Sequence, residues 1–395
     1  MLVTTLFFVS LRSMEILTTI IESYGIAAVV LMLLILLLFI VQIIQQCRYF
    51  IVSRFKLAAR PRIREEQPAV SVVVPLFGED EEYLKGDFRI LLGQSCTNYE
   101  VVAVYVGKED AFYATLRHMR KFYPHLKTTQ IDYSPQYPVT MKMALNIGIK
   151  SATHECVVLT TPETRPTTLE WVDFIARGFM FGDIVLGYCN WEQKRGLKNL
   201  FYRKYRFSEG RTALTEAICG RQYDAFRNCV GFTKQLYFSV RGFDHLDLTA
   251  GEDDLFVQRI ATKNNVSVML TPPAHCSERE PDSVHNWLTE IYRRGQTRRF
   301  YTRRARNAEA CEQICRVAFF VAAIGGLVAL PLELKVAIAF FILTRYIIVG
   351  LVNYKTAKRV GESKIAAWGP LFDLLEPWVR LFIRTTQPQR IYKWR

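Results

Sequence analysis

The sequence predicts a doubly wound α/β domain that is held at a membrane by helices before and after it. Between residues 69 and 179, short runs of apolar, mostly β-branched residues alternate with segments of helical periodicity. Such alternation is typical of parallel strands joined by crossover helices, and strands that are apolar throughout indicate a sheet covered on both faces. Long uncharged apolar runs lie on both sides of this region.

Four pairs of a strand and a helix are expected in the α/β region. The strands are expected at residues 69–77, 99–107, 128–133 and 155–163, and the helices at residues 79–94, 110–123, 139–152 and 169–179. Folds of this class bind ligands outside the carboxyl ends of the strands. The loops that follow the first, second and fourth strands are therefore the expected walls of a ligand site.

The chain is less regular beyond residue 190. A helical pattern covers residues 196–218, an aromatic stretch with turn residues covers 220–243, and a strand pattern begins at residue 266. The motifs GxxxxGK(S/T), HExxH and GxSxG are absent, and the nine cysteines include no CxxC pair. These absences exclude the usual phosphate-loop, zinc-protease, serine-hydrolase and paired-cysteine zinc sites.

Residues 24–44 form an uncharged apolar run. At a rise of 1.5 Å per residue, a helix of about 20 residues crosses a hydrocarbon core of about 30 Å. The run is too long for a cleaved signal peptide, and no small-residue cleavage site follows it. We therefore expect a retained transmembrane helix.

Two further apolar runs, residues 317–332 and 336–352, are separated by only three residues and predict a helical hairpin. Arg345 lies inside the second run. An arginine at this depth usually faces protein, water or a headgroup and is a functional candidate. The alternative is that its long side chain snorkels to the interface from a short helix. The sequence leaves both interpretations open.

Basic residues flank all three apolar runs on the same side. They are dense in residues 47–64 and 292–306 and sparse before residue 24. The positive-inside rule then predicts a multi-pass protein of the cell (inner or plasma) membrane, with residues 45–316 in the cytoplasm. The formal charge of +14 is explained by this topology and by contact with membrane lipids. No basic stripe of a known nucleic-acid module is present, so nucleic acid is not an expected partner.

An acidic triplet, Glu252, Asp253 and Asp254, stands at the start of a predicted helix. Acids in a first turn complement the helix dipole and can cap its amide groups. Three adjacent carboxylates can also serve acid–base chemistry. The triplet alone does not decide between these interpretations.

Five segments, taken in order, carry a resemblance to a known family. They are residues 70–84, 98–107, 142–172, 242–256 and 296–300. The chain resembles family 2 glycosyltransferases, which are inverting enzymes with a GT-A fold, and the flanking helices resemble those of membrane-attached bacterial members. The resemblance implies a GT-A, Rossmann-like nucleotide-diphospho-sugar transferase domain with one N-terminal transmembrane helix and a C-terminal transmembrane hairpin.

The resemblance also divides the chain into segments. We expect a short extracytoplasmic N-terminus, a transmembrane helix, a basic linker, a cytoplasmic GT-A domain, a transmembrane hairpin and a cytoplasmic basic and aromatic interfacial tail. These segments cover residues 1–23, 24–45, 46–68, 69–310, 316–353 and 354–395.

The donor side of the expected site comes from the strand ends. Pro75, Phe77, Glu79 and Asp80 match the end of the family's first strand, which binds the nucleotide. The second strand of the family usually ends in an aspartate, but here Tyr105 stands in that region. A tyrosine can stack on a base, although it cannot supply the charge of a carboxylate.

The family's metal motif is also altered. The usual Asp-x-Asp after the fourth strand, which binds a divalent ion on the diphosphate, is replaced by Thr161-Pro162-Glu163. Glu163 can bind Mg²⁺ or Mn²⁺ through an oxygen, as hard cations prefer, whereas Thr161 is at best a weak ligand. We expect weaker metal binding than in typical members, or replacement of the metal by basic side chains.

The acceptor side matches more closely. In the family, an acidic pair at a helix start faces the acceptor, and its aspartate is the catalytic base. That pattern falls on Glu252 and Asp253, with Asp253 as the base. The family's Gln-x-x-Arg-Trp element falls on Gln296, Arg299 and Phe300, where the arginine would hold the diphosphate and the aromatic ring would pack on the acceptor.

Lys142 and two histidines are further candidates, and Arg299 has an alternative role. Lys142 precedes the third helix and is a weaker diphosphate candidate. Arg299 could instead bind only lipid headgroups. His245 and His275 flank the acidic region, and a lone histidine of this kind is more often structural than a ligand.

The sequence therefore predicts a hexosyltransferase-type enzyme of family 2. It would transfer a sugar from a nucleotide-sugar donor to a lipid-linked or membrane-proximal glycan acceptor in envelope polysaccharide assembly. The alternative is a catalytically degenerate relative that binds a glycan or a partner, because the acidic positions at Tyr105 and Thr161 are lost.

Overall fold

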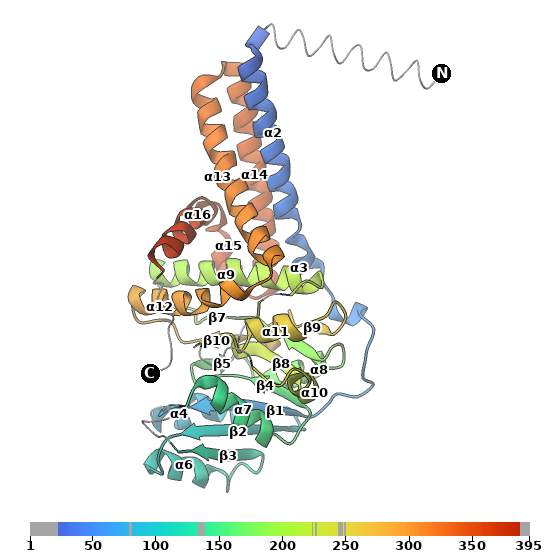
Figure 1. Cartoon of the computed structure of the whole chain (residues 1–395), viewed down its shortest axis with the longest axis vertical. Coiled ribbons are helices and arrows are strands. Elements are labelled where there is room, and N and C mark those ends of the chain that lie inside the picture. Colours follow the sequence, from blue (N-terminus) through green and yellow to red (C-terminus); the bar gives the residue numbers. More distant parts are fainter. Residues whose placement is uncertain are drawn as a thin grey trace, which may run out of the picture.

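The computed structural model describes residues 23–387, except residues 79–80, 133–138, 223, 226, 244–247 and 249. Its elements form three tiers (Figure 1). Long helices stand at one end, a sheet with its covering helices lies at the other, and helix α9 (Leu197–Ile218) crosses between them. The expected α/β class with a mostly parallel sheet is confirmed.

The larger sheet, within the described residues, has seven strands in the order β3-β2-β1-β4-β8-β6-β9. The first four strands in this order are parallel, whereas β8 is antiparallel to both of its neighbours. The chain leaves β1 toward β2 and β3 and then returns to the other side of β1 as β4. Folds of this class bind ligands outside such a switch point. The strands are β1 (Val70–Leu76), β2 (Tyr99–Val106), β3 (Leu126–Ile131), β4 (Cys156–Leu159), β6 (Ile184–Leu186), β8 (Val230–Thr233) and β9 (Val266–Val268).

The central strands are buried along their whole length, as their unbroken apolar sequences predict. One predicted helix, residues 79–94, is in fact interrupted. Two short helices replace it, and they meet at Gly86, whose backbone is not helical. The helices that cover the sheet are α4 (Glu81–Lys85), α5 (Asp87–Leu92), α6 (Ala111–Met119), α7 (Met141–Ser151), α8 (Trp171–Gly178), α10 (Lys234–Ser239) and α11 (Asp254–Ile260).

A second, three-stranded sheet has the order β5-β10-β7 and carries the chain from the main sheet toward α9. Its strands are β5 (Thr164–Pro166), β7 (Cys189–Trp191) and β10 (Cys276–Glu278). The short elements that complete this part of the chain are α3 (Phe50–Arg54), α15 (Ser363–Ala366), η1 (Leu57–Ala59), η2 (Arg227–Cys229), η3 (Pro272–Ala274) and η4 (Thr297–Phe300).

Within the described residues, three helices are long and apolar enough to cross a membrane, namely those at Ile26–Arg54, Arg303–Ala329 and Leu332–Arg359. They correspond to α2 (Ile26–Cys47) with α3, to α13 and to α14, and they stand side by side (Figure 1). The turn between α13 and α14 lies at Leu330 and Pro331 and not at residues 333–335, where we expected it. Proline cannot continue the preceding helix but suits the start of the next one.

Two helices join the bundle to the sheet domain. Helix α16 (Gly369–Thr386) lies beside the base of the bundle, and α12 (Val284–Gly295) runs beneath α9 (Figure 1). Both helices contact α9 through aromatic rings. Phe372 of α16 packs against Phe201 of α9, and Trp287 of α12 stacks on Tyr202 of α9 with ring centroids 4.8 Å apart.

Arg345 is fully buried in the bundle, so the snorkelling interpretation is wrong. Its guanidinium donates to Oδ2 of Asp373 at 2.6 Å and to Oε1 of Gln42 at 2.9 Å. The same guanidinium lies over the rings of Phe319, Phe320 and Tyr346. A buried arginine needs such partners because an uncompensated charge costs several kcal/mol. The pair fixes α14 to α16.

Gly148 of α7 provides a test of the packing of the sheet. A methyl group there would lie 2.4 Å from Cγ1 of Val73 and 2.9 Å from Cγ2 of Val104. Both valines belong to buried strands, so neither can move aside cheaply. We expect Gly148→Ala to lower the free energy of unfolding by about 1–3 kcal/mol, which thermal unfolding of the detergent-solubilised protein would measure.

Gly350→Ala is the matched control. Gly350 is also helical, but the added methyl group would meet no heavy atom within 4 Å. Because alanine favours helices more than glycine does, this variant should unfold at the wild-type temperature or slightly above it. Equal losses in the two variants would contradict the close packing at Gly148.

Candidate active site

The first group of predicted site residues lies where β1 ends. Pro75 is buried in the strand, and Phe77 follows it with a half-buried ring that packs on the core. Glu79 and Asp80, also expected here, lie outside the described residues. The predicted nucleotide-binding roles of these four residues stay predictions.

Tyr105 lies at the end of β2, level with the end of β1. Its ring is 2% exposed and stacks with Phe112 and Tyr113, and its hydroxyl donates to Oδ2 of Asp110 at 2.5 Å. This hydrogen bond, with one from the backbone of Tyr113, holds the pKa of Asp110 below its usual value. Stacking of Tyr105 on a base would therefore require the ring to leave these contacts.

The loop after β4 holds the altered metal motif. The side chain of Thr161 is buried, and its hydroxyl hydrogen-bonds with that of Thr164 at 3.1 Å. Glu163 is exposed, while its backbone carbonyl accepts a hydrogen bond from the amide of Arg279. This loop thus presents one carboxylate at the switch point of the sheet.

Gly251 makes the turn that leads into the acidic triplet. Its φ of +105° lies in a region that residues with a Cβ rarely adopt. A methyl group at Gly251 would lie 3.5 Å from Nζ of Lys142. The buried ammonium of Lys142, a predicted diphosphate ligand, therefore lies beside the start of the triplet.

The triplet is not a simple helix cap. Asp253 occupies the N-cap position of α11, but its side chain makes no capping hydrogen bond. All three acidic residues are buried, with exposed fractions of 1%, 7% and 2% in chain order. Burial of adjacent carboxylates is costly unless each is compensated, so their partners define the site.

The first two acids face consecutive arginines at the end of α12. Arg293 approaches Glu252 with 4.0 Å between Nη1 and Oε1, and it also pairs with Glu290. Arg294 lies between two carboxylates. Its Nη2 is 2.9 Å from Oδ1 of Asp224 and 4.0 Å from Oδ2 of Asp253.

The third acid joins α11 to the segment after α12. Oδ2 of Asp254 accepts hydrogen bonds from the hydroxyls of Thr297 and of Tyr301, the latter at 2.6 Å. Burial raises the pKa of Asp254, and the charges of Asp253 and Asp224 raise it further. Asp254 therefore holds η4 in place beside the triplet.

Asp224 is a fourth acid of the site. Burial raises its pKa, Arg294 opposes this rise, and Asp253 adds to it. Asp224 and Tyr301 also line a small polar cavity of about 30 Å³, which extends toward α13 and α16. A cavity of that size holds a water molecule or two.

The segment Gln296–Phe300 takes its place next to these acids. Gln296 is buried at the end of α12, whereas Arg299 is exposed, and its guanidinium lies 4.6 Å from the ring centroid of Phe300. Phe300 is 38% exposed. The structure thus brings Glu252, Asp253 and Lys142 together, and it leaves Arg299 and Phe300 at the surface.

Sequence reasoning missed four of the residues that surround the triplet. Arg293 and Arg294 were interpreted only as part of a basic approach to the membrane, and Asp224 and Tyr301 were not singled out. A usable signal for the arginines was their position, because the last turn of a helix directly precedes the Gln296 element. Asp224 lies in an irregular loop, where no pattern marks it.

No cluster of three or more His, Cys, Asp or Glu residues that could hold a metal occurs in the described part of the chain. His275 is buried next to Tyr188, and burial lowers its pKa to about 4, so it is a neutral structural residue. His245 lies outside the described residues.

No family model and no curated protein matches the chain by sequence. Among solved structures, it is similar to the mannosyltransferase PcManGT from Pyrobaculum calidifontis in complex with GDP-Man and Mn²⁺. The TM-score is 0.52 at 18% identity, and the match covers 88% of this chain and 99% of that chain. A likeness at this identity shows a common fold.

TarS from S. aureus, solved in complex with UDP-GlcNAc, is less similar. Its TM-score is 0.40 at 16% identity, with 82% of this chain and 93% of that chain covered. This score is too low to establish a common fold.

The raised pKa of Asp254 makes a prediction about stability and pH. The folded protein holds a proton at Asp254 more tightly than the unfolded chain does. The resulting stability is fully present below the unfolded pKa of about 4 and is lost as the pH rises through the folded value. The Asp254→Asn side chain cannot ionise, so the variant does not lose this stability. The melting temperature of the variant minus that of the wild type should therefore increase from pH 4 to pH 8.

Glu100→Gln is a control of the opposite kind. Burial alone would raise the pKa of Glu100, but hydrogen bonds from Ser71, Thr153 and Lys127 lower it to about 2. The stability that Glu100 contributes is therefore present throughout pH 5–8 and is lost only toward pH 2. Its melting difference from wild type should stay constant over pH 5–8. A constant difference for Asp254→Asn over pH 4–8 would contradict the raised pKa.

Proposed function

We propose that this protein is a membrane-attached, inverting glycosyltransferase of family 2. It transfers a hexose-type sugar from a nucleotide-sugar donor to a lipid-linked or membrane-proximal glycan acceptor in envelope polysaccharide assembly. The observation that carries the proposal is the position of Asp253. It is a buried carboxylate held 4.0 Å from Arg294, in a fold shared with a mannosyltransferase.

Asp253 is the proposed general base. In an inverting transfer, an acceptor hydroxyl attacks the anomeric carbon, its proton passes to a carboxylate, and the nucleoside diphosphate leaves with the bonding electron pair. Deprotonation of the hydroxyl contributes about 10²–10⁴ in rate. Asp254 is poorly suited to this role because Thr297 and Tyr301 already donate to one of its oxygens. Glu252, held by Arg293, orients the turn.

The leaving diphosphate requires cations opposite it. Lys142, buried next to Gly251, is one. Arg299, exposed on η4, is another, and a guanidinium can donate to two phosphate oxygens at once. Phe300, which is also exposed, would pack on the acceptor sugar.

A divalent ion fits the site only with help from the substrate. Mg²⁺ is often held by one or two carboxylates together with substrate phosphates, and Glu163 supplies one exposed carboxylate. Glu163 would hold Mg²⁺ or Mn²⁺, and the ion would offset the charge of the diphosphate. The similar mannosyltransferase was solved with Mn²⁺.

The proposed setting is the cell (inner or plasma) membrane. Residues 24–45 and 316–353 would span it, residues 69–310 would form the cytoplasmic catalytic domain, and residues 354–395 would lie at the interface. The basic residues beside each apolar run support this orientation. The short N-terminal segment would lie outside.

One observation favours the alternative of a degenerate relative that binds a glycan or a partner. At both altered positions the replacement residue is engaged within the protein, Tyr105 with Asp110 and Thr161 with Thr164. Neither is set to replace a metal-binding acid. Turnover distinguishes the two functions.

Turnover tests the proposed transfer reaction. Nucleoside-diphosphate release by the purified protein, measured with a panel of nucleotide sugars and membrane lipid extract, should depend on the acceptor. Asp253→Asn should lower release about 10²–10⁴-fold while thermal unfolding shows a folded protein. Asp282→Asn, at an exposed aspartate, should leave release unchanged. Binding of a donor without release of nucleoside diphosphate under all of these conditions would favour the degenerate relative.

The second prediction concerns the metal. Mn²⁺ binding in the presence of a nucleoside diphosphate, followed by electron paramagnetic resonance, should weaken in Glu163→Gln. Glu170→Gln, at an exposed glutamate whose side chain makes no capping hydrogen bond to α8, should bind as the wild type does. Equal affinity in all three proteins would remove Glu163 from the site.

A further inference from the structure

Helix α16 is amphipathic in the reverse sense of a surface helix in a soluble protein. Its charged side chains Asp373 and Glu376 are buried, whereas large apolar side chains on its opposite side are exposed. Trp378 is 59% exposed, and Phe382 is 54% exposed. The outer face, as we define it, consists of Leu371, Leu374, Leu375, Trp378, Leu381 and Phe382.

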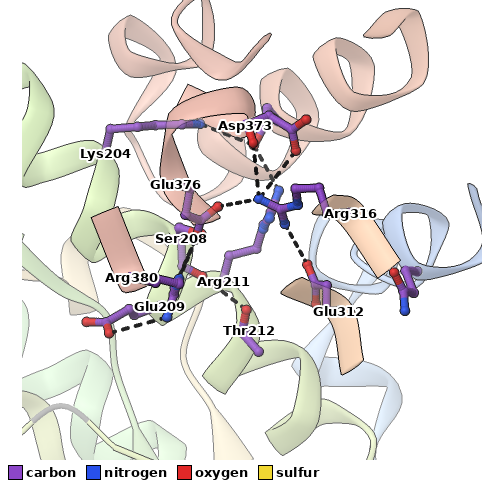
Figure 2. Close-up of polar contacts among 12 residues, drawn as sticks. Lys204, Ser208, Glu209, Arg211, Thr212, Glu312, Arg316, Asp373, Glu376 and Arg380 are labelled. Carbon is purple, nitrogen blue, oxygen red and sulfur yellow. Dashed lines mark hydrogen bonds and ion pairs between the residues drawn. The ribbon is translucent and has the colours of Figure 1, made fainter. Parts of the chain in front are cut away.

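The buried side of α16 is held by ion pairs to the bundle (Figure 2). Asp373 pairs with Arg345 of α14 at 2.6 Å and lies 3.5 Å from Arg316 of α13. Glu376 accepts from Arg316 at 2.8 Å and from Ser208 of α9 at 2.6 Å. The orientation of α16 is therefore fixed, and its outer face cannot turn inward without breaking these pairs.

The outer face belongs to a helix that packs against the apolar bundle. Arg345, the partner of Asp373, lies within the apolar stretch of α14, so α16 lies against helices that are long and apolar enough to cross a membrane. A contiguous exposed apolar face of this kind marks an interaction site. Helices with an apolar face and flanking aromatic and basic residues bind the surface of a bilayer.

The C-terminal end of α16 reaches the candidate active site. The hydroxyls of Thr386 and Tyr292 of α12 hydrogen-bond at 2.7 Å, and the side chain of Gln387 donates to the carbonyl of Tyr292. A methyl group on Gly295 would lie 2.8 Å from Nε2 of Gln387. The end of α16 thus packs against the last turn of α12, next to Gln296.

A second connection runs through α9 (Figure 2). Arg380 of α16 donates to Glu376 at 2.9 Å and lies 3.9 Å from Oε1 of Glu209. The same oxygen of Glu209 accepts a hydrogen bond from Arg298 of η4 at 3.0 Å. Arg298 directly precedes Arg299, the proposed diphosphate ligand.

We propose that the outer face of α16 binds a phospholipid bilayer and that the bound helix positions the Gln296–Phe300 segment. The bilayer holds α16, and α16 holds η4 through Arg380 and Glu209 and α12 through Thr386 and Gln387. Arg380 is therefore a positioning residue. The effect of Arg380 on turnover rests on the proposed function, whereas the contact between the outer face of α16 and lipid does not.

Fluorescence of the full chain in bilayers tests the lipid contact. Brominated phosphatidylcholine quenches tryptophans that touch acyl chains, and acrylamide quenches those that face water. We expect Trp378→Phe to remove part of the emission that bromine quenches. Trp191→Phe, at a half-buried ring against Arg206 in the soluble part, should leave the quenched part unchanged.

Two outcomes would overturn the lipid contact. If acrylamide and not bromine quenches Trp378, the outer face lies in water. If neither quencher reaches Trp378, protein covers the face, and a second copy of the chain becomes the occupant, which the mass of the reconstituted particle would reveal.

The positioning role is tested by hydrogen exchange of residues 293–301 in bilayer discs and in detergent. Wild type should exchange more slowly in discs, and Arg380→Gln should abolish the difference. Arg384→Gln changes an exposed arginine one turn further along the same helix. This variant should keep the difference in exchange between discs and detergent. Equal exchange in discs and detergent for wild type would refute the coupling, whether or not the protein has transferase activity.

Turnover gives the second measure of positioning. Displacement of a catalytic segment by about 1 Å can cost about 10²-fold in rate. The ratio of turnover in discs to turnover in detergent should therefore exceed tenfold for wild type and Arg384→Gln and approach one for Arg380→Gln. An active protein with the same high ratio in all three would exclude the positioning role of Arg380.

Discussion

The cost of burying charge governs how this molecule is assembled. Helix α9 buries five charged side chains, namely Arg203, Lys204, Arg206, Arg211 and Glu216. Each buried ion costs several kcal/mol unless a partner compensates it, and the partners of these side chains come from several different elements. Arg203 pairs with Glu362 after α14, Arg206 with Glu278 of β10, and Arg211 hydrogen-bonds Asn353 of α14. The sheet domain and the long helices therefore both pack on α9. Separating either of them from α9 would leave charged side chains exposed or without their partners.

The same constraint explains the organisation of the candidate site. Three adjacent acids are tolerated in a buried turn because each faces a different group: Glu252 faces Arg293, Asp253 faces Arg294, and Asp254 faces two hydroxyls. All of these groups come from α12 and the residues that follow it. The position of Asp253 is thus determined by where α12 ends, and the end of α12 is in contact with α16. A carboxylate placed in this way is sensitive to the elements that hold α12.

Much of the fold could be predicted because local patterns decide it. Unbroken apolar strands, crossover helices and long uncharged runs each have a signature within one segment, and the acidic triplet of the candidate site is also a local pattern. The partners could not be predicted, because Arg345 and Asp373 or Arg294 and Asp224 are brought together only by the tertiary fold. The turn at Pro331 and the break at Gly86 were missed since the apolar pattern continues past them.

The buried ion pairs also determine what α16 can be. If the helix were an appendage, its removal would leave the rest unchanged. Instead, Arg316 would lose Asp373 and Glu376 and keep Glu312 as its charged partner. Arg345 would lose Asp373 and keep the neutral Gln42 as a hydrogen-bond partner. Removing one partner of a buried pair typically costs about 3–5 kcal/mol, which is a large share of the total stability of a domain. Helix α16 therefore belongs to the core of the junction, and the apolar face that it turns outward is a fixed feature of the molecular surface.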